Sequence, residues 1–141
     1  MKIYNTQSGR KEELVTLNPG QVNMYVCGPT TYNYIHLGNA RPLVVFDMVR
    51  RYLAFRGYRV RYVQNFTDVD GKIINRAREE GDDPIQLAER YIREYFAETD
   101  ALGIVRADIH PRVSDHIPDI ITAIEGLIAK GYAYEVDGDV Y

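Results

Sequence analysis

Apolar and polar side chains alternate over residues 21–27, and this pattern predicts a β-strand. From Leu37 onward the apolar positions follow a helical period, which predicts a helix that ends before Gly57. Pro42 is compatible with this helix only in its first turn, because proline lacks the N–H that later turns need. The polar side chains form one narrow stripe, so we expect the helix to be buried on most sides, against a sheet and a neighbour.

A second strand is predicted over residues 58–63, with Val60 and Tyr62 on one face. Strand, helix and strand together span about 40 residues and form a βαβ unit, whose strands are parallel and whose crossover is right-handed. The expected fold class is therefore α/β, with parallel strands and flanking helices.

Three more helices are predicted downstream of the second strand. They cover residues 68–81, 83–103 and 117–131, and each ends at a glycine. Asp68 and Asp83 are the expected N-caps of the first two, and Pro84 suits a first helical turn.

The last ten residues have the pattern of a β-hairpin. A strand-like segment at 132–136 is followed by Asp137-Gly138, a turn signal, and then by the first three residues of a return strand. A natural terminus seldom falls inside a hairpin, so we expect the chain to be an N-terminal piece of a larger protein.

Composition and charge restrict the class of protein. Of the 141 residues, 45% are hydrophobic and 26% are charged, which excludes an intrinsically disordered chain. The net charge of −3 argues against a dedicated nucleic-acid-binding module. No apolar segment approaches the length of about 20 residues that spans a membrane, and no signal peptide is recognisable. The single cysteine excludes an internal disulfide, so we expect a cytoplasmic protein with no membrane partner.

Arginines gather between Arg41 and Arg61, where six of them stand against the single carboxylate of Asp47. They form either a local anion-binding face or a solvated helix face beside an arginine-lined strand. We favour the second interpretation.

The segment 27–41 carries the candidate chemistry. It leaves the carboxyl end of a parallel strand and opens a helix, which is where open α/β sheets bind ligands and where free N–H groups favour phosphate. His36 and Asn39 lie on one side of the helix start and can donate hydrogen bonds to phosphoryl oxygens. Gly38 has no side chain, so a base or ribose can approach the backbone closely.

Three runs in the sequence carry a resemblance to a known family. They are Tyr-Val-Cys-Gly-Pro-Thr at 25–30, His-Leu-Gly-Asn-Ala-Arg at 36–41 and Asn-Phe-Thr-Asp-Val-Asp at 65–70. Together they resemble the N-terminal half of the catalytic domain of the cysteinyl-tRNA synthetases, a class I family whose phosphate-binding signature is matched by residues 36–39. The similarity spans essentially the whole chain.

The resemblance implies a Rossmann-like nucleotide-binding half-domain over residues 1–141. It implies an ATP-dependent ligase that activates cysteine as cysteinyl-adenylate and transfers it to tRNA(Cys), with ATP bound together with Mg²⁺. It also implies a zinc ion that takes the substrate thiolate as a ligand, and we expect a cytoplasmic monomer.

By the same resemblance, site residues carry over position by position. The implied catalytic residues are His36 and Asn39, and the implied zinc ligand is Cys27. The implied amino-acid-binding residues are Gly28 and Thr67. The implied ATP-binding residues are Pro29, Thr30, Thr31, Tyr32, His36, Gly38 and Asn39.

The sequence departs from the family pattern at several points. Asn39 replaces the second histidine of the signature, and Gly71 stands where relatives usually have an aspartate. The second signature, Lys-Met-Ser-Lys-Ser, and the other zinc ligands do not occur in the 141 residues. We therefore expect this chain alone not to activate cysteine.

Alternative interpretations remain for the function and for single residues. The chain could belong to the related ligase that joins cysteine to an amino sugar in mycothiol synthesis, or be a free-standing nucleotide-binding module. Taken alone, Cys27 could be a structural thiol, and Asp68 with Asp70 could be paired catalytic carboxylates, although a helix cap at Asp68 explains them more simply. His110 and His116 are expected to be ordinary loop and helix-start residues.

Overall fold

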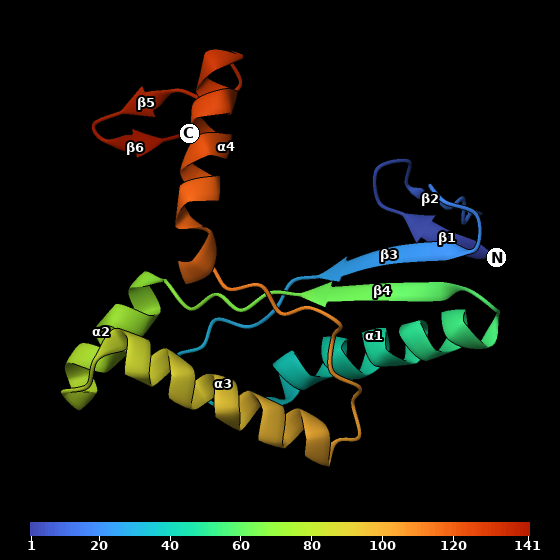
Figure 1. Cartoon of the computed structure of the whole chain (residues 1–141), viewed down its shortest axis with the longest axis horizontal. Helices are drawn as coiled ribbons and strands as arrows, with labels where there is room; N and C mark the ends of the chain where they lie inside the picture. The colour runs from blue at the N-terminus through green and yellow to red at the C-terminus, as the bar shows by residue number, and fades with distance from the viewer.

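The computed structural model describes residues 1–141 and is organised around a parallel pair of strands (Figure 1). The elements in chain order are β1 (Lys2–Asn5), β2 (Arg10–Glu13), β3 (Gln21–Val26), α1 (Leu37–Phe55), β4 (Arg59–Gln64), α2 (Gly71–Glu80), α3 (Pro84–Ala101), the 3-10 helix η1 (Ser114–His116), α4 (Ile117–Ala129), β5 (Glu135–Val136) and β6 (Asp139–Val140).

The predicted βαβ unit is confirmed. β3 and β4 are parallel, with a register that runs from Gln21 opposite Arg59 to Val26 opposite Gln64. In Figure 1, α1 and α3 lie on one side of this pair, and α4 projects away on the other. The α/β fold class is therefore correct.

A third parallel stretch lies beside β4 and makes it the central strand. Isolated bridges pair Val63 with Ile109 and Phe66 with Arg112. The N–H of Gln64 donates to the carbonyl of Ile109 at 3.1 Å. The chain therefore returns to the sheet after α2 and α3.

Two small apolar clusters hold the helices together. In the first, Ile73 and Ala77 of α2 pack against Leu87, Ala88 and Tyr91 of α3. In the second, Phe66 lies two residues after the end of β4 and contacts Leu43 of α1 and Ile92 and Tyr95 of α3. Burying apolar side chains between sheet and helices is the main force that fixes these elements in place.

The expected burial of α1 on most sides is wrong. Several of its apolar side chains face solvent, with Leu37 87% and Phe55 85% exposed. The packed side instead includes part of the polar stripe, because Asp47 is buried and accepts from the backbone N–H of Val105 at 3.1 Å. Arg50 likewise donates to the carbonyl of Arg106 at 2.7 Å.

Contacts of this kind also explain the roles of two of the arginines between residues 41 and 61. Arg50 forms an ion pair with Asp108 at 2.7 Å, and Arg51 forms one with Asp47 at 2.7 Å. Arg51 also donates to the carbonyl of Gly103 at 2.8 Å, so both guanidinium groups fix α1 to the segment after α3, which neither interpretation of the arginine cluster predicted.

Two details of the helix boundaries also differ from expectation. The N-cap of α2 is Asp70, whose side chain accepts from Lys72 N–H at 2.8 Å. Asp68 instead accepts from the N–H and the hydroxyl of Ser114. Pro42 lies inside α1, beyond its first turn. The predicted ends of α2, α3 and α4, and the start of α3 at Asp83 and Pro84, are confirmed.

The N-terminal hairpin of β1 and β2 was not predicted, and the C-terminal hairpin was. Almost all side chains of β1 and β2 are exposed, so the hairpin lacks the apolar alternation that would reveal it. At the other end, Asp137 and Gly138 have φ angles of 54° and 91°, as a tight hairpin turn requires. No helix has both the length and the apolar composition needed to cross a membrane.

Candidate active site

His36 caps the N-terminus of α1 with its own ring. Its backbone is extended (φ −106°, ψ 172°), and its Nδ1 accepts from Gly38 N–H at 3.0 Å. An Nδ1 atom that accepts a hydrogen bond carries no proton, so the ring proton lies on Nε2. Nδ1 of His36 thus accepts a hydrogen bond from the helix backbone, and Nε2 remains free to donate one to a ligand.

Asn39 completes this cap from the first turn of α1. Its Oδ1 accepts from the backbone N–H of His36 at 3.2 Å, which leaves the Nδ2 amide as a free donor. Gly38 permits the arrangement, because a Cβ there would lie 2.8 Å from His36 Cε1. The structure therefore gives Gly38 a second role beside the predicted close approach of a ligand: it makes room for the His36 ring.

A pocket of about 300 Å³ opens beside this cap. The residues that line it are Pro29, Thr30, Tyr32, Asn33, Tyr34, Ile35, His36, Asn39 and Lys72. None of them is acidic, and Lys72 is the single charged member, with its Nζ 5.7 Å from the Tyr32 ring centroid. A pocket with amide, imidazole, hydroxyl and ammonium donors and no carboxylate is suited to an anionic ligand.

A smaller pocket of about 90 Å³ lies across the same loop. Its lining includes Cys27 and Gly28 together with Gly38 and Asn39, so Asn39 belongs to both pockets. The sequence-predicted residues at the end of β3 and at the start of α1 are therefore brought together.

Thr31 and Thr67 line neither of these two pockets. Thr31 is buried, and both its N–H and its hydroxyl donate to the carbonyl of Thr67, at 3.1 and 3.3 Å. Thr67 lies in the loop that follows β4 and is partly buried. The structure thus gives Thr31 a role in holding these two loops together.

Cys27 is exposed, and no group of three or more His, Cys, Asp or Glu side chains in the chain is arranged to hold a metal ion. Structural and catalytic zinc sites use three or four protein ligands. The 141 residues by themselves therefore do not form a zinc site, and Cys27 supplies at most one ligand.

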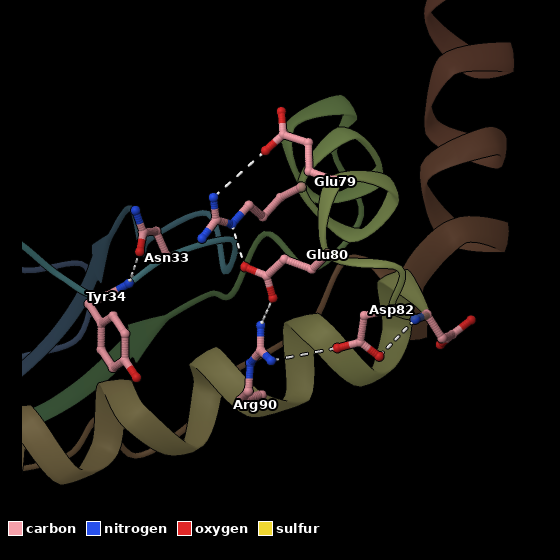
Figure 2. A network of polar contacts seen from close by, with 8 residues as sticks. Asn33, Tyr34, Glu79, Glu80, Asp82 and Arg90 are labelled. Carbon is pink, nitrogen blue, oxygen red and sulfur yellow. Dashed lines mark hydrogen bonds and ion pairs between the residues drawn. The ribbon is translucent and has the colours of Figure 1, made fainter.

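An ion-pair network fixes α2, which carries Lys72, against α3 (Figure 2). Glu80 lies between two guanidinium groups, pairing with Arg76 at 2.6 Å and with Arg90. Arg90, which donates to Glu80, holds the pKa of that carboxyl below its usual value. Close by, the Tyr34 and Tyr91 rings meet edge to face at 5.4 Å, which joins the pocket loop to α3.

Comparison with known proteins places the sequence that forms this site in a family. The catalytic domain of class I (C) tRNA synthetases matches residues 13–141. The chain belongs to this family. Among curated proteins it is 68% identical to the Cysteine--tRNA ligase of Pelotomaculum thermopropionicum, and 64% identical to those of Carboxydothermus hydrogenoformans and Moorella thermoacetica, in each case over all 141 residues. It spans 29–30% of the length of these relatives.

The resemblance deduced from the sequence is thus correct for this synthetase domain. The sequence did not single out the pocket-lining residues Asn33, Tyr34, Ile35 and Lys72, nor Asn65. Lys72 is the second residue of a helix that follows a parallel strand, and this position could have pointed to it. Asn65 is one residue beyond the end of β4, and no sequence signal distinguishes its role from that of an ordinary loop amide.

Proposed function

We propose that this synthetase domain provides the nucleotide- and amino-acid-binding surface of a protein that activates cysteine with ATP and transfers it to tRNA(Cys). The observation that carries the proposal is the acid-free pocket at the carboxyl ends of β3 and β4, built from the cap of α1 and from Lys72. The names of the relatives, Cysteine--tRNA ligase, support cysteine and tRNA as the substrates of the whole protein. They do not favour the amino-sugar ligase or the free-standing module.

In the proposed first step, a carboxylate oxygen of cysteine attacks the α-phosphorus of ATP. The new bond joins that oxygen to the α-phosphorus, and the bond to the bridging oxygen breaks to release pyrophosphate. Negative charge grows on the phosphoryl oxygens, so fixed donors stabilise the transition state most strongly. His36 Nε2–H, Asn39 Nδ2, the Thr30 hydroxyl and Lys72 Nζ are the proposed donors, and Mg²⁺ would accompany the ATP.

In the second step, a ribose hydroxyl of the terminal tRNA adenosine attacks the carbonyl carbon of cysteinyl-adenylate, and AMP leaves. The binding roles of Pro29, Thr31 and Tyr32 toward ATP, and of Gly28 and Thr67 toward cysteine, are part of the proposal. Of these, Pro29 and Tyr32 line the larger pocket, and Gly28 lines the smaller one.

Zinc enters the proposal only through Cys27, as one thiolate ligand of a site completed by residues outside this chain. Zinc binds thiolates and would favour the thiol of cysteine over the hydroxyl of serine. The test is the zinc content of a protein in which these 141 residues replace the matching 30% of the C. hydrogenoformans ligase, hereafter the chimera. Cys27→Ser should lower its zinc content, and an unchanged content would exclude Cys27 as a ligand.

Charging of tRNA(Cys) tests the function itself. The chimera should attach radiolabelled cysteine to tRNA(Cys), whereas the 141-residue chain alone should stay at background. Replacing tRNA(Cys) with another tRNA, or cysteine with serine, serves as the control. A folded chimera that fails to charge tRNA(Cys), although the parent ligase charges it, would contradict the proposal.

A further inference from the structure

Asn65 joins the two loops on which the proposed amino-acid site depends. It lies directly after β4, and its side-chain oxygen Oδ1 accepts from the Gly28 N–H at 2.9 Å and from the Tyr25 hydroxyl at 2.9 Å. Its amide nitrogen Nδ2 donates to the Thr67 hydroxyl oxygen at 3.3 Å. One side chain thus contacts the residue after Cys27 and the hydroxyl of Thr67 at once.

The orientation of this amide is determined by its partners. A backbone N–H can only donate, so the group that faces Gly28 must be the oxygen of Asn65. The nitrogen then faces Thr67, whose hydroxyl oxygen must accept. No other hydrogen bond is made by this hydroxyl within the chain, so its proton is free to be donated to a ligand.

We infer that Asn65 is a positioning residue for the amino-acid substrate: it makes the Thr67 hydroxyl a donor and fixes the backbone at Gly28, the residue after Cys27. This inference rests on the proposed function. A hydroxyl that donates is complementary to the carboxylate of the amino acid, which is an acceptor and the group that reacts. A hydroxyl turned to give its proton to residue 65 would present a lone pair to that carboxylate instead.

Asn65→Asp in the chimera tests the inference with almost no change in shape. One carboxylate oxygen still accepts from Gly28 and Tyr25, while the other accepts the proton of Thr67 and reverses its hydroxyl. In ATP–pyrophosphate exchange, KM for cysteine should rise about 10-fold, the equivalent of one hydrogen bond, while KM for ATP and the melting temperature stay within experimental error.

Two controls separate this effect from the added negative charge. Asn23→Asp on β3 adds the same charge at an exposed site, keeps the oxygen that accepts from Gln21, and should leave both KM values unchanged. In a Thr67→Val background, Asn65→Asp should have no further effect on KM for cysteine, because no hydroxyl remains to be reversed.

The outcomes distinguish this inference from the proposed function. If the unsubstituted chimera shows no cysteine-dependent exchange, the proposed function fails. If the unsubstituted chimera is active, the inference is overturned by an unchanged KM for cysteine in Asn65→Asp, or by an equal rise in KM for ATP. An effect that persists undiminished in the Thr67→Val background would overturn it as well.

Discussion

Gly28 and Asn65 approach each other so closely that no side chain fits between them: a Cβ on Gly28 would lie 1.6 Å from the carbonyl oxygen of Asn65. The contact joins the loop that leaves β3 to the loop that leaves β4. It sets how near the end of β3, with Cys27, lies to Thr67. A glycine is required at position 28 because there is no space for a Cβ, and not because of an unusual backbone angle.

Gly28→Ala should therefore displace the loop and destabilise the fold. The expected loss is about 1–3 kcal/mol, as for other overpacked sites, because the methyl group meets backbone atoms that cannot rotate away. Gly126→Ala in α4 is the matched control, since nothing lies within 4 Å of its Cβ position. Equal melting temperatures for the two variants of the chimera would show that the contact is looser than described.

Gly71 is the first residue of α2, and its Cβ position is open. Gly71→Asp should stabilise the helix by about 0.5–1 kcal/mol, because a helical glycine loses more backbone entropy than other residues and an acid suits a helix N-terminus. Chemical denaturation of the chimera measures the change. Lower stability would mean that the glycine is needed for a reason other than local helix geometry.

Lys72 is expected to bind a phosphate group of ATP. Lys72→Met should raise KM for ATP about 10-fold in the exchange reaction, because one charge-assisted hydrogen bond to a phosphate is lost. Arg78→Met removes a positive charge from the last turn of the same helix and should change KM for ATP little. Equal effects of the two substitutions would indicate general electrostatics and exclude a specific contact from Lys72.

The environment of the His110 ring predicts how the stability of the fold depends on pH. Its ring stacks on Phe66 at 5.0 Å, its Nδ1 lies 2.9 Å from the Gln64 carbonyl, and burial, with a smaller contribution from Arg106, lowers its pKa below 6.5. The unfolded chain then binds a proton more readily than the folded one, so stability should be full above about pH 6.5 and fall as the pH decreases below it. The protonation of Glu80 and Asp100, whose pKa values are also lowered, affects stability only at more acidic pH.

Hydrogen exchange of the amides of Gln64 and Phe66, which bond to the neighbouring segment, reports this dependence locally. Their protection factors should drop between pH 7 and pH 5. In His110→Asn, which keeps an N–H donor near the Gln64 carbonyl, the drop should be much smaller. The same drop in both proteins would assign the pH dependence to another group.

Sequence patterns predicted those parts of this fold that depend on local spacing. The alternation in β3, the Asp83-Pro84 start of α3 and the Asp137-Gly138 turn are local signals, and the structure agrees with each. The burial of α1 was mispredicted because the face of α1 that packs depends on the segment after α3. This segment donates a hydrogen bond to Asp47, which lies 58 residues earlier in the chain. Asp68 and Asp70 are equally good caps by type, and only Ser114, 46 residues away, decides between them.

The candidate site, too, was predictable where its residues are close together in the sequence. The loop from Cys27 to Asn39 was identifiable because its residues are contiguous in sequence. Lys72 lies at the start of α2, a position that could have pointed to it, whereas Asn65 reaches the site through hydrogen bonds between different loops, which no spacing rule describes.

His36 offers the most direct test of the proposed chemistry. His36→Asn should keep the cap of α1, because asparagine is a preferred N-cap residue, but it removes the donor at Nε2. We predict that the chimera catalyses cysteine-dependent ATP–pyrophosphate exchange and that this substitution lowers kcat about 10²-fold, with little change in KM for cysteine or in melting temperature. Exchange that needs no cysteine, or a His36→Asn variant that affects KM alone, would contradict the role of this pocket in activating cysteine.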